Sequence, residues 1–193
     1  MDEFPEDDPE YPGVRWVLAQ YILFYFEDGK AMPRCQDLPA KAFGTIKDAT
    51  RVFAVTHPWL GRWHPDPAGI QTETMRAKLT KMKKQIMLDP TDVVFYDYLC
   101  LPQCDVNGVD DRSAKEKERF RLALSGDLMG RIYLTCRVIF IDEVPTNAES
   151  NTQYLARGWC YFESVVASMN TFPRDLAWTE KSLKDEIARF REM

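Results

Sequence analysis

The stretch Arg51-Val-Phe-Ala-Val-Thr56 decides the fold, because it is apolar at successive positions and not only at alternate ones. Two later segments have the same character: Asp92-Val-Val-Phe-Tyr-Asp-Tyr-Leu99 and Arg137-Val-Ile-Phe-Ile141. Strands that are apolar on both faces are typical of a parallel sheet that is covered on both sides. The three segments therefore predict the strands of such a sheet.

Helical patterns separate these strands. Residues 71–88 carry apolar side chains at helical spacing and follow Asp66 and Pro67, which offer a cap and a first-turn proline. Ser113 and Glu116 have the spacing of a capping box and predict a second helix. Its inward-facing residues are predicted to be Phe120, Leu124 and Leu128. The alternation predicts an α/β fold with an open, mostly parallel sheet and helices on both faces.

The two ends of the chain differ from this pattern. Residues 1–13 are acidic and proline-rich and are predicted to be a flexible tail, whereas residues 14–27 have the apolar spacing of an extra N-terminal helix. The chain closes with a helical pattern through Leu183, Ile187 and Phe190. Because 193 residues with 45% hydrophobic side chains suit one core, residues 14–193 are predicted to form a single domain.

The composition argues against several classes of protein. The formal charge of -5, without a long run of lysine or arginine, predicts no nucleic-acid partner. The longest apolar run, residues 16–26, is interrupted by Gln20 and is shorter than the roughly 20 residues that span a bilayer, so no membrane segment is expected. Five scattered cysteines, an odd number, favour a reducing, cytoplasmic setting over a disulfide framework.

Polar residues gather where the predicted strands end. Ligands of open α/β sheets bind beyond the carboxyl ends of the strands, and there the chain carries residues 56–69, 97–103 and 142–158. Next comes Trp159-Cys-Tyr-Phe-Glu163, in which the tryptophan and the glutamate are four residues apart and share one face of a helix. An aromatic ring beside a carboxylate suits a cationic or sugar-bearing ligand.

The order of these motifs resembles the Toll/interleukin-1 receptor (TIR) domain superfamily, in particular a divergent, NAD-cleaving branch. The likeness covers residues 50–170 and rests on the Trp-Cys-x-x-Glu string that opens the helix after the third strand, together with a loop of the type Trp63-His-Pro-Asp-Pro-x-Gly69. It implies a TIR-like, flavodoxin-like domain. The chain departs from the family after Met169, where no apolar strand follows, and in the loop after the second strand.

The resemblance implies an activity for Glu163, whose position matches the catalytic glutamate of the enzymatic members. These enzymes cleave nicotinamide from NAD to give ADP-ribose or a cyclic isomer, with NAD as substrate and no separate cofactor. Because nicotinamide leaves as a neutral base, no acid has to protonate it, in contrast to ordinary glycoside hydrolysis. One carboxylate that stabilises the oxocarbenium ion therefore suffices. The resemblance also implies self-association.

Seven further residues are candidates for contacts with the substrate. Asp97 and Gln103 are placed to hydrogen-bond a ribose or an amide, and His57 and Arg62 to reach the diphosphate. An aromatic face stabilises a pyridinium ring by about 0.5–2 kcal/mol. The aromatic candidates are Trp159, Trp59 and Trp63.

Structural interpretations of the same residues stay open. Glu163 could be a solvated helix residue or the ion-pair partner of Arg157, and Trp59 and Trp63 could be packing residues. The Cys-x-x-x-Cys spacing at Cys100, without a second cysteine pair, is a poor zinc pattern, so no metal site is predicted. Two other functions also stay open: a TIR-like signalling scaffold without turnover, and a nucleoside deoxyribosyltransferase-like enzyme.

Overall fold

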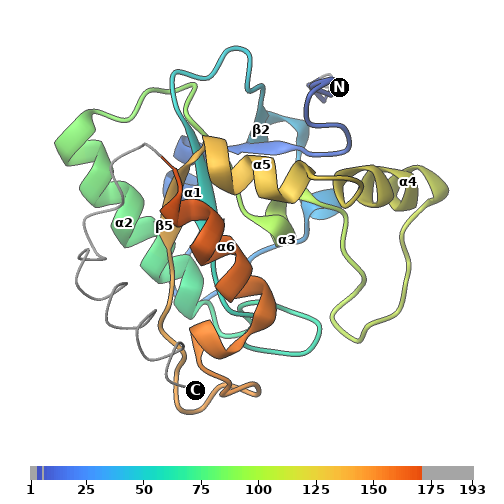
Figure 1. Cartoon of the computed structure of the whole chain (residues 1–193), viewed down its shortest axis with the longest axis vertical. Helices are drawn as coiled ribbons and strands as arrows, with labels where there is room; N and C mark the ends of the chain where they lie inside the picture. Colours follow the sequence, from blue (N-terminus) through green and yellow to red (C-terminus); the bar gives the residue numbers. More distant parts are fainter. Residues whose placement is uncertain (1–3, 6, 171–193) are drawn as a thin grey trace.

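A computed structural model describes residues 4–5 and 7–170, and Figure 1 shows how the elements are arranged. The predicted helix through Leu183, Ile187 and Phe190 lies outside the described residues. Five strands form one sheet in the order β2-β1-β4-β3-β5. Their bounds are Trp16–Leu18 (β1), Phe43–Gly44 (β2), Val52–Thr56 (β3), Val93–Phe95 (β4) and Arg137–Phe140 (β5).

The sheet is open and mostly parallel, as predicted. Strand β3 pairs in parallel with both β4 and β5, so the three strands that the sequence predicts are neighbours. Strand β1 runs antiparallel to β4 and to β2. Strands β2, β4, β3 and β5 therefore point the same way, and β1 alone among the described strands is reversed.

Helices flank the sheet, so the α/β class is confirmed (Figure 1). The α-helices are α1 (Ala19–Tyr25), α2 (Ile70–Ile86), α3 (Asp97–Cys100), α4 (Ala114–Ala123), α5 (Leu128–Thr135) and α6 (Gly158–Ser168). Three short 3-10 helices are η1 (Cys35–Asp37), η2 (Ala40–Ala42) and η3 (Tyr154–Ala156). Helix α1 contacts α2, and α5 contacts α6. The connections from β3 to β4 and from β4 to β5 cross the sheet in opposite directions, and right-handed crossovers then place α2 and α5 on opposite faces.

The prediction of one N-terminal helix over residues 14–27 is wrong in its first part. Residues Trp16–Leu18 form β1, in which Val17 pairs with Val94, and the helix begins only at Ala19. The backbone of β4 offers hydrogen bonds on the side away from β3, and a buried Trp-Val-Leu segment fits that position well. Tertiary pairing here overrides the helical spacing.

Two other boundaries differ from the sequence pattern. Strand β4, the second of the three predicted strands, ends at Phe95. Asp97 then accepts a hydrogen bond from the main-chain N–H of Tyr98 (2.6 Å) and starts the short helix α3. The helix after the capping box is broken into α4 and α5, with Gly126 between them in a left-handed conformation (φ 64°). The capping box itself is present, whereas Leu124 is exposed and does not face the core.

Part of the acidic N-terminal stretch lies against the domain. Tyr11 is buried and packs edge-on against Trp16, with the ring centroids 5.3 Å apart. Asp7 forms an ion pair with Arg119 of α4 (2.6 Å). These contacts connect the segment before β1 to the helix that precedes α5.

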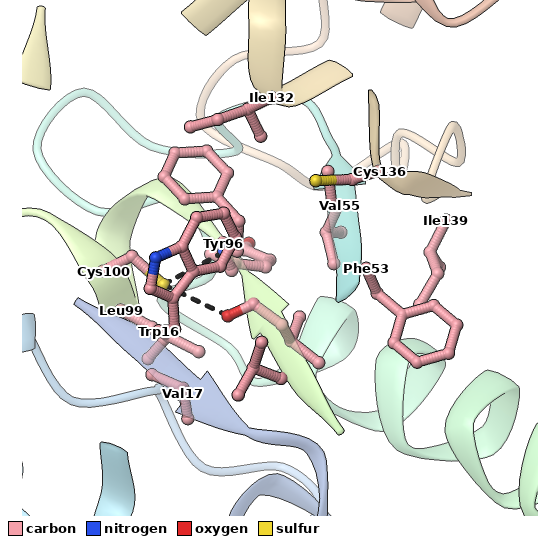
Figure 2. Close-up of a cluster of buried hydrophobic side chains, with 14 of the residues drawn as sticks. Trp16, Val17, Phe53, Val55, Tyr96, Leu99, Cys100, Ile132, Cys136 and Ile139 are labelled. Carbon is pink, nitrogen blue, oxygen red and sulfur yellow. Dashed lines mark hydrogen bonds between the residues drawn. The ribbon is translucent and has the colours of Figure 1, made fainter. Parts of the chain in front are cut away.

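The core lies on both faces of the central strands, and Figure 2 shows a part of it. Cys100 follows β4 and is fully buried. Its Sγ donates a hydrogen bond to the carbonyl of Val94 (3.3 Å) and accepts one from the N–H of Tyr96 (3.3 Å). Within residues 4–170 as described, none of the helices has the length and apolar character that crossing a bilayer requires.

Candidate active site

The carboxylate of Glu163 meets the end of the central strand β3. The hydroxyl of Thr56, the last residue of β3, donates a hydrogen bond to Oε2 of Glu163 (2.5 Å). The hydroxyl of Tyr154, in η3, lies 2.5 Å from the same Thr56 oxygen, and Ser164 lies 3.0 Å from the Tyr154 hydroxyl. Because the single proton of Thr56 goes to Glu163, Tyr154 donates to Thr56. Glu163 is only 3% exposed.

The local sequence of α6 turns Glu163 inward. Five residues of the helix are buried and form its inner face: Cys160, Glu163, Ser164, Val166 and Ala167. The helical spacing of Phe162, Val165, Val166 and Met169 predicts a different inner face, but Phe162 (42% exposed) and Met169 (61% exposed) lie at the surface. Small residues on the inner face allow α6 to approach β3 closely, which brings Glu163 to Thr56.

Burial dominates the electrostatics of Glu163. It raises the pKa of this carboxyl to about 7, although the hydrogen bond from Thr56 and the charge of His57 act in the opposite direction. In the part of the chain that the structure describes, no lysine or arginine forms an ion pair with Glu163. A carboxyl group with a pKa near neutral and no ion pair to a lysine or arginine is free to respond to a charge on a ligand.

Arg157 is not the ion-pair partner that one interpretation of the sequence proposed. Its guanidinium donates hydrogen bonds to the carbonyl oxygens of Trp59 (2.7 Å), Ser150 (3.0 Å) and Thr152 (2.9 Å). These carbonyls belong to the loop after β3 and to the loop after β5. Arg157 therefore fixes the two loops that surround the end of the sheet.

A second cluster lies next to Thr56. Nε2 of His57 is 2.9 Å from Oδ1 of Asp97, and Nε1 of Trp59 donates to Oδ2 of the same carboxylate (3.0 Å). Burial lowers the pKa of His57, but the charge of Asp97 and its hydrogen bond outweigh it, and the net shift is upward. Burial likewise raises the pKa of Asp97, but His57, Trp59 and the N–H of Tyr98 together lower it.

The structure thus brings four of the predicted site residues together: Glu163, His57, Asp97 and Trp59. Gln103 is close by, since its amide nitrogen donates to the main-chain carbonyl of Asp97 (3.3 Å). The ring nitrogens of His57 and both carboxylate oxygens of Asp97 already have protein partners.

Three other predicted residues lie further out. Trp159 is half exposed, and its ring packs against Phe162 rather than beside Glu163. Trp63 is partly exposed and has the Arg62 guanidinium over its ring at 5.1 Å. The tight fit of Trp63 against Gly108, where an added Cβ would come within 2.4 Å of the ring, favours a packing role for this tryptophan.

The sequence does not identify the residues that position His57, Asp97 and Thr56 through hydrogen bonds. Gln71 of α2 donates its amide N–H to the carbonyl of Pro58 (2.5 Å) and accepts from the Tyr96 hydroxyl (2.5 Å). Tyr96 could have been found from its place directly before Asp97 in a buried strand, since a buried hydroxyl requires a partner. No pattern singles out Tyr154, because it comes from an irregular loop.

Two cavities lie elsewhere among the described residues. One of about 420 Å³ is bounded by α1 and the connection that follows it, and one of about 470 Å³ by α2; Glu163 lines neither. The carboxyl of Glu163 instead lies against protein. Among the described residues, no cluster of histidine, cysteine, aspartate and glutamate has the arrangement of a metal site.

Comparison with known proteins does not identify a family for this chain. No protein-family model matches the chain, and neither a curated protein nor a solved structure is significantly similar to it. The residues at the carboxyl end of β3 are therefore the features of this chain that indicate a function.

Proposed function

We propose that this chain is a TIR-like NAD+ glycohydrolase that cleaves the bond between nicotinamide and ribose, with Glu163 as its catalytic residue. One observation carries the proposal. Glu163 is a buried carboxyl group without an ion pair to a lysine or arginine among the described residues, and it is held by Thr56 at the end of the central parallel strand. A buried acid of this kind at a sheet end is a common feature of functional sites.

The order of the parallel strands supports the proposal. The first of them, β3, lies between the second, β4, and the third, β5. In flavodoxin-like sheets this order creates a switch point beside the first strand, and ligands bind there beyond the carboxyl ends. Thr56 stands at that point as the last residue of β3 that pairs with β5, and His57 follows it directly.

The chemistry requires only one carboxylate. Nicotinamide leaves with both electrons of its bond to C1′ of the ribose, which neutralises its ring nitrogen and leaves an oxocarbenium ion. Water then adds to C1′ and loses a proton to give ADP-ribose; attack by an adenine nitrogen gives a cyclic isomer. The ionised form of Glu163 stabilises the positive charge on the ribose, and a water-poor site strengthens this effect.

The other candidate residues divide into two groups. The polar side-chain atoms of His57 and Asp97 are hydrogen-bonded to other protein groups, so these two residues support the site and do not bind the ligand directly. Trp59, which is half-buried beside them, offers its ring to the pyridinium, and Gln103, Trp159, Trp63 and Arg62 are left for the outer parts of the dinucleotide.

Access to the site requires a movement. Because Glu163 is 3% exposed, NAD reaches it only when part of the rim opens. The 3-10 helix η3 holds Tyr154 against Thr56 and is the segment that we expect to move. Self-association of the domain in the cytoplasm, which the TIR resemblance implies, would be the event that opens it.

A specific observation favours a second candidate, a TIR-like signalling scaffold without turnover. The carboxyl of Glu163 lies against Thr56 and is 3% exposed, and neither of the two cavities described above reaches it. In a scaffold this carboxyl would serve only to fix α6 on β3. The two candidates differ in whether Glu163 ever contacts a ligand.

The experiment is to incubate the purified protein with NAD over a range of protein concentrations and to measure nicotinamide release. We expect turnover that Glu163→Gln lowers by about 100-fold or more, because the stabilising charge is lost. The matched control is Glu73→Gln, which removes an exposed carboxylate on α2 and should keep the wild-type rate.

Each other outcome points to a different conclusion. Nicotinamide release that Glu163→Gln leaves unchanged removes this residue from the mechanism. No turnover at any concentration, combined with self-association, favours the scaffold. Cleavage of deoxynucleosides but not of NAD indicates a deoxyribosyltransferase-like enzyme instead.

A further inference from the structure

A chain of hydrogen bonds beneath the site fixes the protonation of one residue. It starts at the carbonyl of Pro58, which can only accept a hydrogen bond. The amide nitrogen of Gln71 donates to this carbonyl (2.5 Å), so the orientation of the Gln71 amide is fixed. Its oxygen therefore faces the hydroxyl of Tyr96, 2.5 Å away, and can only accept.

The single proton of Tyr96 is used by Gln71, and this determines what His57 must do. The Tyr96 oxygen is left as an acceptor 3.0 Å from Nδ1 of His57, so Nδ1 carries a proton and donates it. If Tyr96 donated to His57 instead, the Gln71 oxygen would lie 2.5 Å from another oxygen with no proton between them.

The second ring nitrogen of His57 is protonated as well. Nε2 lies 2.9 Å from Oδ1 of Asp97, a carboxylate that also accepts from Trp59 and from the N–H of Tyr98 and so stays ionised. A carboxylate offers only acceptors, so Nε2 donates. His57 is therefore an imidazolium cation, although it is 5% exposed.

The chain contains one other histidine, His64, and its hydrogen bonds dictate the opposite state. Nδ1 of His64 accepts from the main-chain N–H of Asp66 (2.9 Å), and Nε2 donates to the carbonyl of Met32 (3.0 Å). One nitrogen accepts and the other donates, so His64 is neutral. Burial lowers the pKa of His64, in agreement with this arrangement.

The groups around His57 come from several elements. Asp97 from α3 and Glu163 from α6 carry negative charge, whereas Gln71 from α2 and Tyr96 after β4 are neutral partners. The Cys160 thiol of α6 donates to the main-chain carbonyl of His57 (3.3 Å). Both carboxylate oxygens of Asp97 accept hydrogen bonds. Glu163, which accepts a hydrogen bond from Thr56, the residue directly before His57, is the second anion near the His57 cation.

We propose that His57 is a positioning residue for the reaction proposed above: held as a buried cation by Gln71, Tyr96 and Asp97, it favours the ionised form of Glu163. The inference rests on the proposed function for its catalytic meaning, because only the carboxylate form stabilises an oxocarbenium ion. Burial disfavours that form, and a neighbouring positive charge restores it. His57 acts through Glu163 and does not touch the substrate.

The first test needs no substitution and no activity. In the nitrogen-15 NMR spectrum of the wild-type protein at about pH 7.5, where an unperturbed histidine is mostly neutral, we expect two protonated ring nitrogens for His57. We expect one protonated nitrogen, Nε2, for His64. A His57 ring with a bare Nδ1 at this pH overturns the inference.

The second test uses His57→Gln, which removes the charge, with His64→Gln as the matched control. We expect the pH at which Glu163 ionises, followed by carbon-13 NMR of its carboxyl, to move up by about one unit in His57→Gln, and the pH profile of NAD cleavage to move with it. At a pH near 6.5 this is a loss of roughly tenfold in rate that disappears at high pH. His64→Gln should leave both midpoints in place.

The two proposals fail in different ways. An NAD-inactive protein in which His57→Gln still moves the Glu163 midpoint rejects the proposed function and keeps the charge coupling. An active protein with the same midpoint in both variants rejects the role of His57 and keeps that of Glu163. A folding defect in His57→Gln leaves the wild-type nitrogen spectrum as the deciding measurement.

Discussion

The hydroxyl of Thr56 controls the charge of Glu163 at the scale of single residues. It donates the hydrogen bond that most favours the carboxylate form against burial. We predict that Thr56→Val, which keeps the shape of the side chain and removes the donor, raises the pKa of Glu163 further above about 7. A pH titration of the Glu163 carboxyl by carbon-13 NMR measures this shift.

The control for this change is Thr80→Val, an exposed threonine on α2. It should leave the titration of Glu163 unchanged. If Thr56→Val also leaves it unchanged, the hydrogen bond from Thr56 has no effect on the charge of the carboxyl.

The residues of the site could be predicted only in part. The sequence identifies His57 and Asp97 because polar residues after apolar strands gather at one edge of a sheet, and it identifies Glu163 because this residue follows Trp159 by four positions in a motif that resembles the TIR one. The partners that set the charge of these residues could not be predicted from the sequence. Gln71 hydrogen-bonds to Pro58 and Tyr154 to Thr56 from other elements of the fold. Contacts of this kind depend on the tertiary fold and leave no local pattern.

At the scale of elements, the start of α2 depends on a close approach of two backbone segments. Gly69 precedes the helix with φ +74°, and a Cβ there would lie 2.5 Å from the main-chain nitrogen of Lys30. Gly29 has nearly the same φ (+72°), but a Cβ there would meet nothing within 4 Å. The two glycines thus separate conformational strain from steric overlap.

We predict that Gly69→Ala lowers the free energy of unfolding by more than Gly29→Ala does. Both substitutions cost roughly 1–2 kcal/mol for the left-handed backbone, and the overlap with Lys30 adds about 1–3 kcal/mol at Gly69. Urea unfolding of the two variants measures the difference. Equal losses would mean that the segments separate at no cost.

The elements themselves were predictable where one physical rule decides. The three central strands are apolar on both faces, and Ser113 with Glu116 forms the expected capping box. The spacing rules failed where two structures compete for the same residues. Val17 and Leu18 fit a helix by their spacing, but they form strand β1 and pair with β4. In α6, the polar Glu163 faces the core and Phe162 faces the surface.

At the scale of the whole molecule, the site makes the protein less stable as the pH rises. The pKa of Glu163 is raised from 4.5 to about 7 by burial, so its stabilising contribution is complete below about pH 4.5 and is lost by pH 7. The pKa of His57 is also raised, because Asp97 outweighs burial, so its contribution is lost only above 6.5. The free energy of unfolding is therefore expected to fall from about pH 5 to about pH 8.

Glu163→Gln removes the first of these contributions. Relative to this variant, the wild-type protein should lose roughly 2–3 kcal/mol of stability between about pH 5 and about pH 8, because the pKa of Glu163 is raised from 4.5 to about 7. Urea unfolding of both proteins at each pH measures this double difference, and Glu73→Gln is the control. Parallel curves would show that Glu163 is as easily ionised in the folded chain as in the unfolded one.

Strand β1 has a consequence for how the chain assembles during synthesis. It leaves the ribosome before β2 and β4, and it occupies an interior place in the sheet, between these two strands. Until residues 93–95 emerge, one side of β1 has unpaired main-chain groups, which are a template for association with other nascent chains. A fragment that begins after residue 50 lacks β1, and the side of β4 that pairs with β1 is then left without a partner. The residues before the first parallel strand are therefore an integral part of the folding unit.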